Sequence, residues 1–353
     1  MNKKAGFIAP IILAFCMVCG CLERYADGHR RSYPVAIRDL VGPEDPLAVQ
    51  DLSFDARFAE HALEILDSGG RQSEAVLETE PATFHLLNHA RQFGYSVPHD
   101  SAADLVASLL EGESASGRKA ETCRRSLEFF SGPMLENPGW VGDALGYLPP
   151  GFRFHGTLFL TFGYDIGVAL APNASLNGAH RHFDGHPHEL IYYAIHELHH
   201  VGFQTLRPPP RIGSIKTAGD LRRFVEYATQ MEGMAVLAAW ERRRADGALA
   251  EDGDYIALGN EGTMRTEEAR YFQLFEGLLD EGDPRDMDET LERLDRFSSG
   301  DRLWYRVGAH MAAAIEKANG RAALVAMVGE DPAGFIETYR KLRALESRRA
   351  SSP

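Results

Sequence analysis

The sequence predicts an α+β fold that is predominantly α-helical, and three observations support this class. Apolar residues recur at helical spacing through most of the chain after residue 55. Two β-type runs stand close together at residues 157–162 and 166–170. The chain has 353 residues, of which 44% are hydrophobic and 25% charged, so it can bury a sizeable core.

The charge balance argues against one class of partner. Lys and Arg number 37 against 51 Asp and Glu, a formal net charge of -14. Such a field repels phosphate backbones, so nucleic acid is not expected as a partner.

The first twenty residues have the pattern of an export signal. Lys3 and Lys4 precede an apolar run at 7–18, which is too short to span a bilayer as a helix. The string Val18-Cys19-Gly20-Cys21 resembles the bacterial lipobox, in which the cysteine after a small residue is lipidated and becomes the mature N-terminus. We therefore expect a signal peptide over residues 1–20 and palmitate-type acyl chains on Cys21, which would anchor the protein to a membrane of the cell envelope, outside the cytoplasm.

A plain secretory signal is the alternative interpretation. Cys21 and Cys123 would then be free to form one disulfide in an oxidising compartment. If Cys21 is lipidated, Cys123 is a lone thiol, and we expect it to be a buried small hydrophobe because no histidine lies near it in the sequence.

The mature chain divides into three parts by composition. Residues 21–50 are rich in Gly, Pro and charge, which indicates a tether. A helical N-terminal region is expected over 51–118, and the small polar stretch 111–119 separates it from a second domain over 119–346. The two β-type runs predict a hairpin, with Gly163-Tyr164-Asp165 as its turn. Helices are expected at about 55–67, 80–94, 101–110, 187–202, 221–244, 266–279, 304–318 and 332–345.

The segment His196-Glu197-Leu198-His199-His200 contains the H-E-x-x-H pattern of zinc sites. Apolar residues at helical spacing from Leu190 to Val201 predict the helix that this pattern requires. His196 and His200 then point the same way and can bind one metal ion at about 2.0 to 2.1 Å. Glu197 is turned about 100° away, so it can act on a water at the metal instead of ligating.

His199 offers a second way to bind the metal, since His196 and His199 are also neighbours on a helix. We prefer His200, because only the four-residue spacing leaves Glu197 in the expected place. His199 is then expected to lie beside the site or in its pocket.

A catalytic zinc needs a third protein ligand, and Glu232 is the candidate. In the helix predicted over 221–244, apolar residues form one stripe and Glu232 falls at its centre. A buried carboxylate needs a cation, and zinc held by two histidines would supply it. A structural ion pair is the alternative role. Glu226, the rival ligand, falls on the opposite side of that helix and is expected to be a solvated surface charge.

At this point the chain resembles a family. The strings Ile195-His196-Glu197-Leu198-His199-His200-Val201-Gly202 and Glu232-Gly233-Met234-Ala235 resemble those of gluzincin-type zinc metallopeptidases, and more closely those of little-characterised zinc-dependent peptidase families with HExHH followed by EGxA. Tyr305-Arg306-Val307-Gly308-Ala309-His310-Met311-Ala312 is similar to a third helical motif of these families. The resemblance covers roughly residues 130–339.

The resemblance implies a zincin-like catalytic domain with a small hairpin or sheet beside the H-E-x-x-H helix and one Zn²⁺ per chain. It offers Tyr305, with His310 as a substitute, as the donor to the oxyanion of the reaction. Asn173-Ala174 resembles the dipeptide of the edge strand with which gluzincins hold a peptide backbone.

We therefore expect an exported, lipid-anchored zinc metallopeptidase that acts on a peptide or protein substrate, with zinc on His196, His200 and Glu232 and with Glu197 as general base. The alternatives are a non-catalytic zinc-binding envelope lipoprotein and a zinc hydrolase of another amide, such as a cell-wall peptide.

One motif remains outside this interpretation. Seven of the fourteen histidines lie between His180 and His200, with a dense group at 180–188. That group is either an accessory metal or substrate loop, or a solvated loop next to the site.

Overall fold

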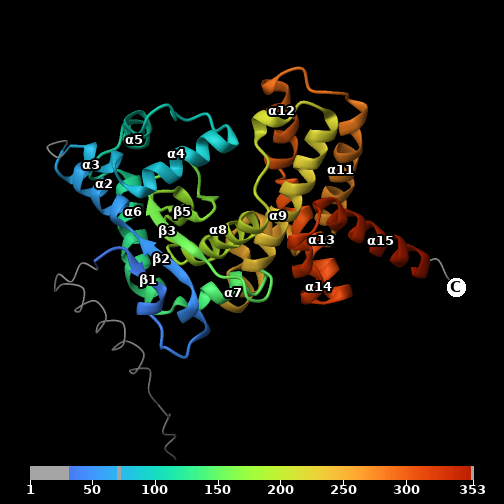
Figure 1. Ribbon diagram of the computed structural model, residues 1–353, viewed down its shortest axis with the longest axis horizontal. Coiled ribbons are helices and arrows are strands. Elements are labelled where there is room, and N and C mark those ends of the chain that lie inside the picture. The colour runs from blue at the N-terminus through green and yellow to red at the C-terminus, as the bar shows by residue number, and fades with distance from the viewer. Residues whose placement is uncertain (1–31, 70–72, 351–353) are drawn as a thin grey trace, which may run out of the picture. The chain divides into compact units, whose positions relative to one another are not determined.

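The computed structural model describes residues 32–69 and 73–350 (Figure 1). The expected export signal at 1–20 and the expected anchor Cys21 lie outside these residues. Within the described part, no helix has the length and apolar character needed to cross a bilayer.

One mixed sheet of five strands, in the order β1-β2-β3-β5-β4, organises half of the fold. β2 pairs in parallel with β3 and antiparallel with β1, while β5 pairs in parallel with β3 and antiparallel with β4. β4 is therefore an edge strand. The bounds are β1 Val35–Ala36, β2 Asp51–Asp55, β3 His155–Thr161, β4 Gly167–Leu170 and β5 Asn173–Asn177.

The helices outnumber the strands, which confirms the predicted α+β, predominantly helical class. Their bounds are α2 Arg57–Asp67, α3 Ala75–Glu78, α4 Pro81–Phe93, α5 Ala102–Leu110, α6 Arg118–Phe129, α7 Val141–Leu145, α8 Glu189–Leu206, α9 Ala218–Asp246, α10 Gly253–Leu258, α11 Glu261–Asp280, α12 Met287–Ser298, α13 Leu303–Asn319, α14 Arg321–Ala326 and α15 Pro332–Ala350.

The hairpin predicted over 157–170 is wrong. β3 and β4 do not pair, because β5 lies between them, and the hairpin is formed by β4 and β5 around Ala171 and Pro172. Asn and Ser, which make up much of β5, are rare in strands, so the local sequence does not announce it.

Residues 33–50, which composition assigns to a tether, are packed in the structure. Ile37 and Leu47 belong to the buried core, and the Tyr33 hydroxyl lies 2.7 Å from the Ser131 hydroxyl. β2 continues this segment into the sheet with alternating burial. The compact unit accordingly runs without a break from Tyr33 across the expected boundary at 118–119.

Cys123 lies on α6 as a fully buried free thiol. Burial raises the pKa of this thiol to about 12. It therefore has the environment expected of a small hydrophobe rather than of a nucleophile.

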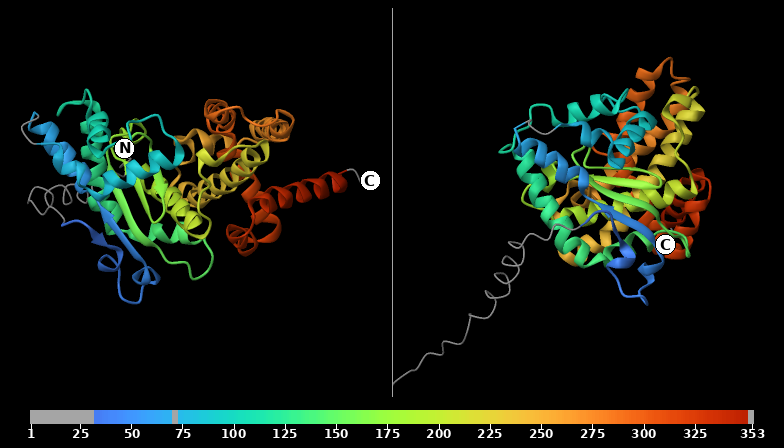
Figure 2. Two further views of the ribbon diagram at one scale, coloured as in Figure 1. Left: turned by 45° about the horizontal axis from the view of Figure 1, so that its top comes forward. Right: turned by 60° about the vertical axis from the view of Figure 1, so that its left-hand side comes forward.

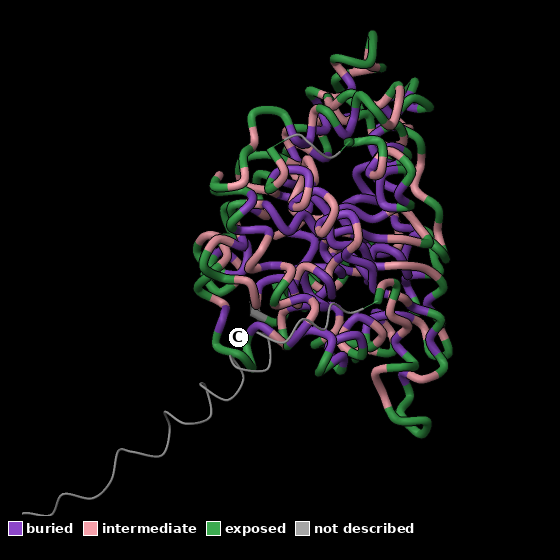
Figure 3. Tube along the Cα trace, turned by 90° about the vertical axis from the view of Figure 1, so that its left-hand side faces the viewer, coloured by how far each residue is buried: buried purple, intermediate pink, exposed green. Residues whose placement is uncertain are grey.

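Helix α8 lies between the sheet and the C-terminal helices. One side of it packs against β4 and β5, and another packs against α9, which is itself covered by α13, α11 and α15 (Figures 1 and 2). Figure 3 shows buried segments running through the centre of the fold. Because α8 and α9 are both held from several sides, their side chains are fixed relative to one another.

The contact between α9 and α13 depends on two glycines. A Cβ added at Gly233 would lie 2.5 Å from the Cα of Gly308, and one added at Gly308 would lie 3.0 Å from the Cα of Gly233. The two backbones therefore meet where no side chain fits. This crossing positions the helix that carries Glu232 against the helix that carries Tyr305.

We predict that Gly308→Ala lowers the free energy of unfolding by about 1 to 3 kcal/mol, because the extra methyl must push two helix backbones apart. It should also weaken zinc binding, since Glu232 moves with α9. Urea unfolding and a zinc titration measure both effects. Gly334→Ala is the control: an added Cβ there meets no atom within 4 Å, so its stability should equal or slightly exceed that of the parent. Equal stability of the two variants would contradict the prediction.

Candidate metal centre

Helix α8 is longer than its sequence pattern predicts. It begins at Glu189, with this acidic residue in its first turn, and continues to Leu206 instead of ending at Gly202. Gly202 serves packing: a Cβ there would lie 2.6 Å from Cδ2 of Leu148. The helix is thus pressed closely against the loop that follows α7.

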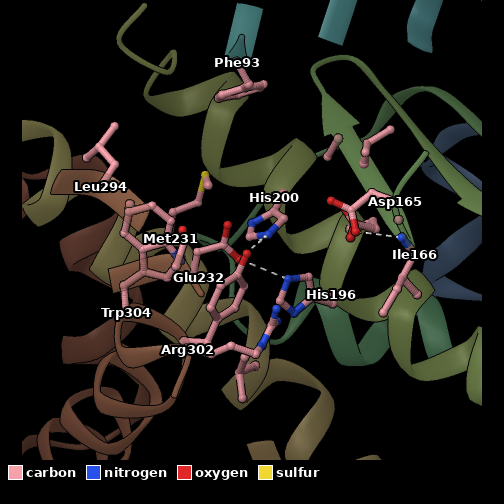
Figure 4. Close-up of a pocket in the computed structure, with 18 of the residues that line it drawn as sticks. Phe93, Asp165, Ile166, His196, His200, Met231, Glu232, Leu294, Arg302 and Trp304 are labelled. Atoms are coloured by element: carbon pink, nitrogen blue, oxygen red, sulfur yellow. Dashed lines mark hydrogen bonds and ion pairs between the residues drawn. The ribbon is translucent and has the colours of Figure 1, made fainter. Parts of the chain in front are cut away.

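The two histidines and Glu232 meet around one point (Figure 4). Oε2 of Glu232 lies 3.2 Å from Nε2 of His196 and 2.9 Å from Nε2 of His200. Their side chains are 13%, 6% and 12% exposed for His196, His200 and Glu232 respectively. The structure therefore brings together the three residues that the sequence analysis selects as ligands.

The electrostatics of the trio favour an ionised carboxylate. Burial by itself would raise the pKa of Glu232, but the attraction of His200 and the hydrogen bonds from both imidazoles hold that pKa well below its usual range. Burial and the neighbouring His200 lower the pKa of His196, whereas Glu232 overcomes burial and raises the pKa of His200. The site thus offers one negative charge and two imidazoles in a nearly dry pocket.

These donors fit a zinc ion. In a tetrahedral site with bonds of about 2.0 to 2.1 Å, neighbouring ligand atoms lie about 3.3 Å apart. The two separations around Glu232 are close to this value. Among the described residues, Nδ1 of His200 has no hydrogen-bond partner, so the ring is oriented by packing and by the contact of its Nε2 with Glu232. Two neutral nitrogens and one carboxylate oxygen are a donor set that zinc commonly binds.

The Glu197 carboxylate lies against the edge strand β4, in the lining of the same cleft as the trio. A Cβ added at Gly167 in β4 would lie 2.6 Å from Oε1 of Glu197, so the carboxylate rests directly on that glycine. Burial raises the pKa of Glu197 to about 8, although the nearby His200 opposes the rise. A carboxyl group with a raised pKa beside a cleft is suited to exchange protons near neutral pH.

Tyr305 lies beside the trio, and its partner Arg302 is a residue that sequence reasoning missed. The ring of Tyr305 is stacked on that of His196 with centroids 6.4 Å apart. Burial, reinforced by the charge of Glu232, raises the pKa of Tyr305, so its hydroxyl keeps its proton. The Arg302 guanidinium lies 3.7 Å above the Tyr305 ring and pairs with Asp254. Arg302 also has a positive φ of 50°, a strained conformation for a residue with a side chain.

The structure also places three further residues that the sequence analysis discusses. His310, the substitute for Tyr305, packs against Tyr339 away from the cleft. His199 does not reach the pocket: it is fully buried beside Phe203, and burial lowers its pKa to about 3. Glu226 is not solvated but only 8% exposed, and it pairs with Arg222.

A cleft of about 640 Å³ opens in front of the trio. One wall comes from the N-terminal helical region, which supplies His89, Phe93 and Tyr95. Asp165, which no motif marked, accepts a hydrogen bond from the Tyr95 hydroxyl at 2.7 Å and lies on the sheet side of the two imidazoles in Figure 4. The opposite wall includes Leu294 and Trp304.

Fold and site together define a mostly helical protein in which two helices present a His-His-Glu centre, with a further glutamate, at a deep cleft beside a sheet edge. Residues 141–346 match the model of a family whose description reads "Putative zinc dependent peptidase (DUF5700)", and the chain belongs to this family. Neither the curated proteins nor the solved structures gave a match. The matched span contains α8, α9 and α13, and hence the whole trio, Glu197 and Tyr305.

We predict that Glu232→Gln reduces zinc binding at this centre by more than tenfold, because the amide removes the negative charge that both imidazoles face. Equilibrium dialysis against buffered zinc measures the loss. Glu226→Gln is the matched control, since it neutralises another buried carboxylate on the same helix and should leave the affinity unchanged. Equal affinities of the two variants would exclude Glu232 as a ligand.

Proposed function

We propose that this protein is a zinc metallopeptidase that hydrolyses peptide bonds at the centre formed by His196, His200 and Glu232. The observation that carries the proposal is the convergence of these three donors on one point, with Glu197 buried beside them and open to the cleft. A zinc ion there supplies Lewis acidity, which lowers the pKa of water to about 7 and polarises a carbonyl group.

The side chains divide the remaining work. Glu197 takes the proton of the attacking water and returns it to the leaving amine. Tyr305 keeps its proton and donates a hydrogen bond to the oxyanion of the tetrahedral intermediate. The stacked Arg302 holds the Tyr305 ring in place and adds positive charge near the developing oxyanion.

The backbone of a peptide substrate can bind along an edge of the sheet. The strand at this edge is β4, not the strand that contains Asn173 and Ala174, which the sequence indicates. Asn173 and Ala174 lie in β5, inside the sheet, whereas β4 is the edge strand and lines the cleft. The N–H of Asn177 donates to the carbonyl of Ile166 at 2.8 Å. Antiparallel pairs alternate, so Gly167 and Ala169 turn their backbone groups away from β5.

Gln204 on α8 occupies part of this edge, so fewer backbone groups are left for a peptide. Its side-chain amide donates to the carbonyl of Ala169 at 3.0 Å and accepts from the N–H of Ala171 at 3.0 Å. The N–H and carbonyl of Gly167 and the N–H of Ala169 remain on the outer side of the strand. They suit a short extended peptide bound through its main chain, which favours broad specificity over recognition of one sequence.

The N-terminal pattern supports a location for this activity. We propose that the chain is exported, that Cys21 carries the lipid anchor and that the peptidase unit faces the outside of the cytoplasm. Lipobox-like residues 18–21 after a short apolar run are the support for this part of the proposal.

We predict that Glu197→Gln abolishes hydrolysis of casein or of a peptide library, while zinc content stays at the parent level, because Glu197 moves protons and does not hold the metal. Gly167→Ala should act in the same direction by displacing the Glu197 carboxylate. Mass spectrometry of the digests and metal analysis of the same samples give both readings. If the zinc-loaded parent cleaves nothing, the protein is a zinc binder; if Glu197→Gln keeps full activity, Glu197 is not the base.

A further inference from the structure

We infer that the chain binds a second divalent cation, of the zinc type, through His186, His188 and Glu251. Nε2 of His188 lies 2.8 Å from Oε2 of Glu251, and Nδ1 of His186 lies 3.8 Å from the same oxygen. The three candidate ligand atoms all lie within 4.8 Å of one another. The residues come from the histidine-rich loop before α8 and from the short 3-10 helix η7, Leu249–Glu251, that follows α9.

The three side chains are spaced so that one small metal ion can bind to all of them. The separations of 2.8 and 3.8 Å bracket the spacing of about 3.3 Å between ligands of tetrahedral zinc. Two imidazoles and one carboxylate match the donor set of the first centre. The side chains are 54%, 40% and 35% exposed for His186, His188 and Glu251, so a fourth ligand can come from water.

The carboxylate of Glu251 lacks the arginine partner that the carboxylates of a nearby buried group of possible ligands have among the described residues. Among His182, Glu189 and Asp252, the guanidinium of Arg243 already neutralises the carboxylates, with two hydrogen bonds to Glu189 and a 3.6 Å approach to Asp252. That group has no place for a metal. Within the residues that the structure describes, no Arg or Lys pairs with Glu251, so its charge faces only the two imidazoles.

A cation bound at this place would link the two helices that carry the first metal centre. His186 and His188 lead into α8, which carries His196 and His200, and Glu251 follows α9, which carries Glu232. A cation bound by all three would fasten the beginning of α8 to the segment after the end of α9. The ion pair between Glu189 and Arg243 joins the same two helices, and it is more deeply buried than the three residues of the proposed cation site. The second ion would therefore stabilise the helix pair on which the first centre depends.

The stoichiometry of binding tests this inference independently of any peptidase activity. Chelator-treated protein without a histidine tag is dialysed against buffered zinc, and bound metal is counted by elemental analysis. We expect two ions per chain for the parent, one for His188→Ala and one for Glu251→Gln. Glu232→Gln should also bind one ion, at the surface site, and Glu232→Gln combined with His188→Ala should bind none.

His155→Ala is the matched control, because it removes another exposed histidine that lies beside a carboxylate, Asp51, and that belongs to no group of three candidate ligands among the described residues. It should bind two ions like the parent. Circular dichroism verifies that each variant is folded. Because the side chains of His188 and Glu251 lie outside the core, their replacement should remove the ion without unfolding the protein. A parent that binds no more ions than His188→Ala or Glu251→Gln would overturn the inference, whatever the total.

Discussion

The burial of Glu232 is the constraint on which the rest of the structure depends. A carboxylate that is only 12% exposed must face positive charge or donors, and here two imidazoles from another helix supply them at 3.2 and 2.9 Å. Two imidazoles and one carboxylate are also the donors that a divalent cation between the three would bind. The burial of these donors therefore fits the zinc dependence that the description of the family names.

Close packing is what turns this constraint into a fixed geometry. Gly233 and Gly308 let α9 and α13 touch through their backbones, Gly202 lets α8 press on Leu148, and Gly167 makes room for Glu197. At each of these places a methyl group would displace one of the helices or the Glu197 carboxylate. The motif glycines are therefore explained by the space that the site requires rather than by flexibility.

The sequence predicts the relations within one helix better than the contacts between segments that are far apart in the chain. Helical period alone places His196 and His200 on one face and Glu232 in an apolar stripe, because these relations are local. The position of β5 between β3 and β4 depends on contacts across the chain, and the strand at 51–55 gains its partner from residue 155 onward. The prediction that Glu226 is a solvated surface charge is wrong, because α9 is covered on several sides and the face opposite its apolar stripe is also buried. Asp165 and Tyr95 carry no spacing signal and meet only in the fold.

The most direct test of the account is zinc X-ray absorption spectroscopy on protein loaded with one equivalent of the metal, in a parent whose second cation site is removed by His188→Ala and in the same protein with Glu232→Gln added. The account predicts for the parent two imidazole nitrogens and oxygen ligands at about 2.0 to 2.1 Å with no sulfur. In the variant the same spectrum should change to that of a different or much weaker site. A parent spectrum with a single imidazole or with sulfur, or a spectrum that Glu232→Gln leaves unchanged, would contradict the claim that α8 and α9 share one metal ion.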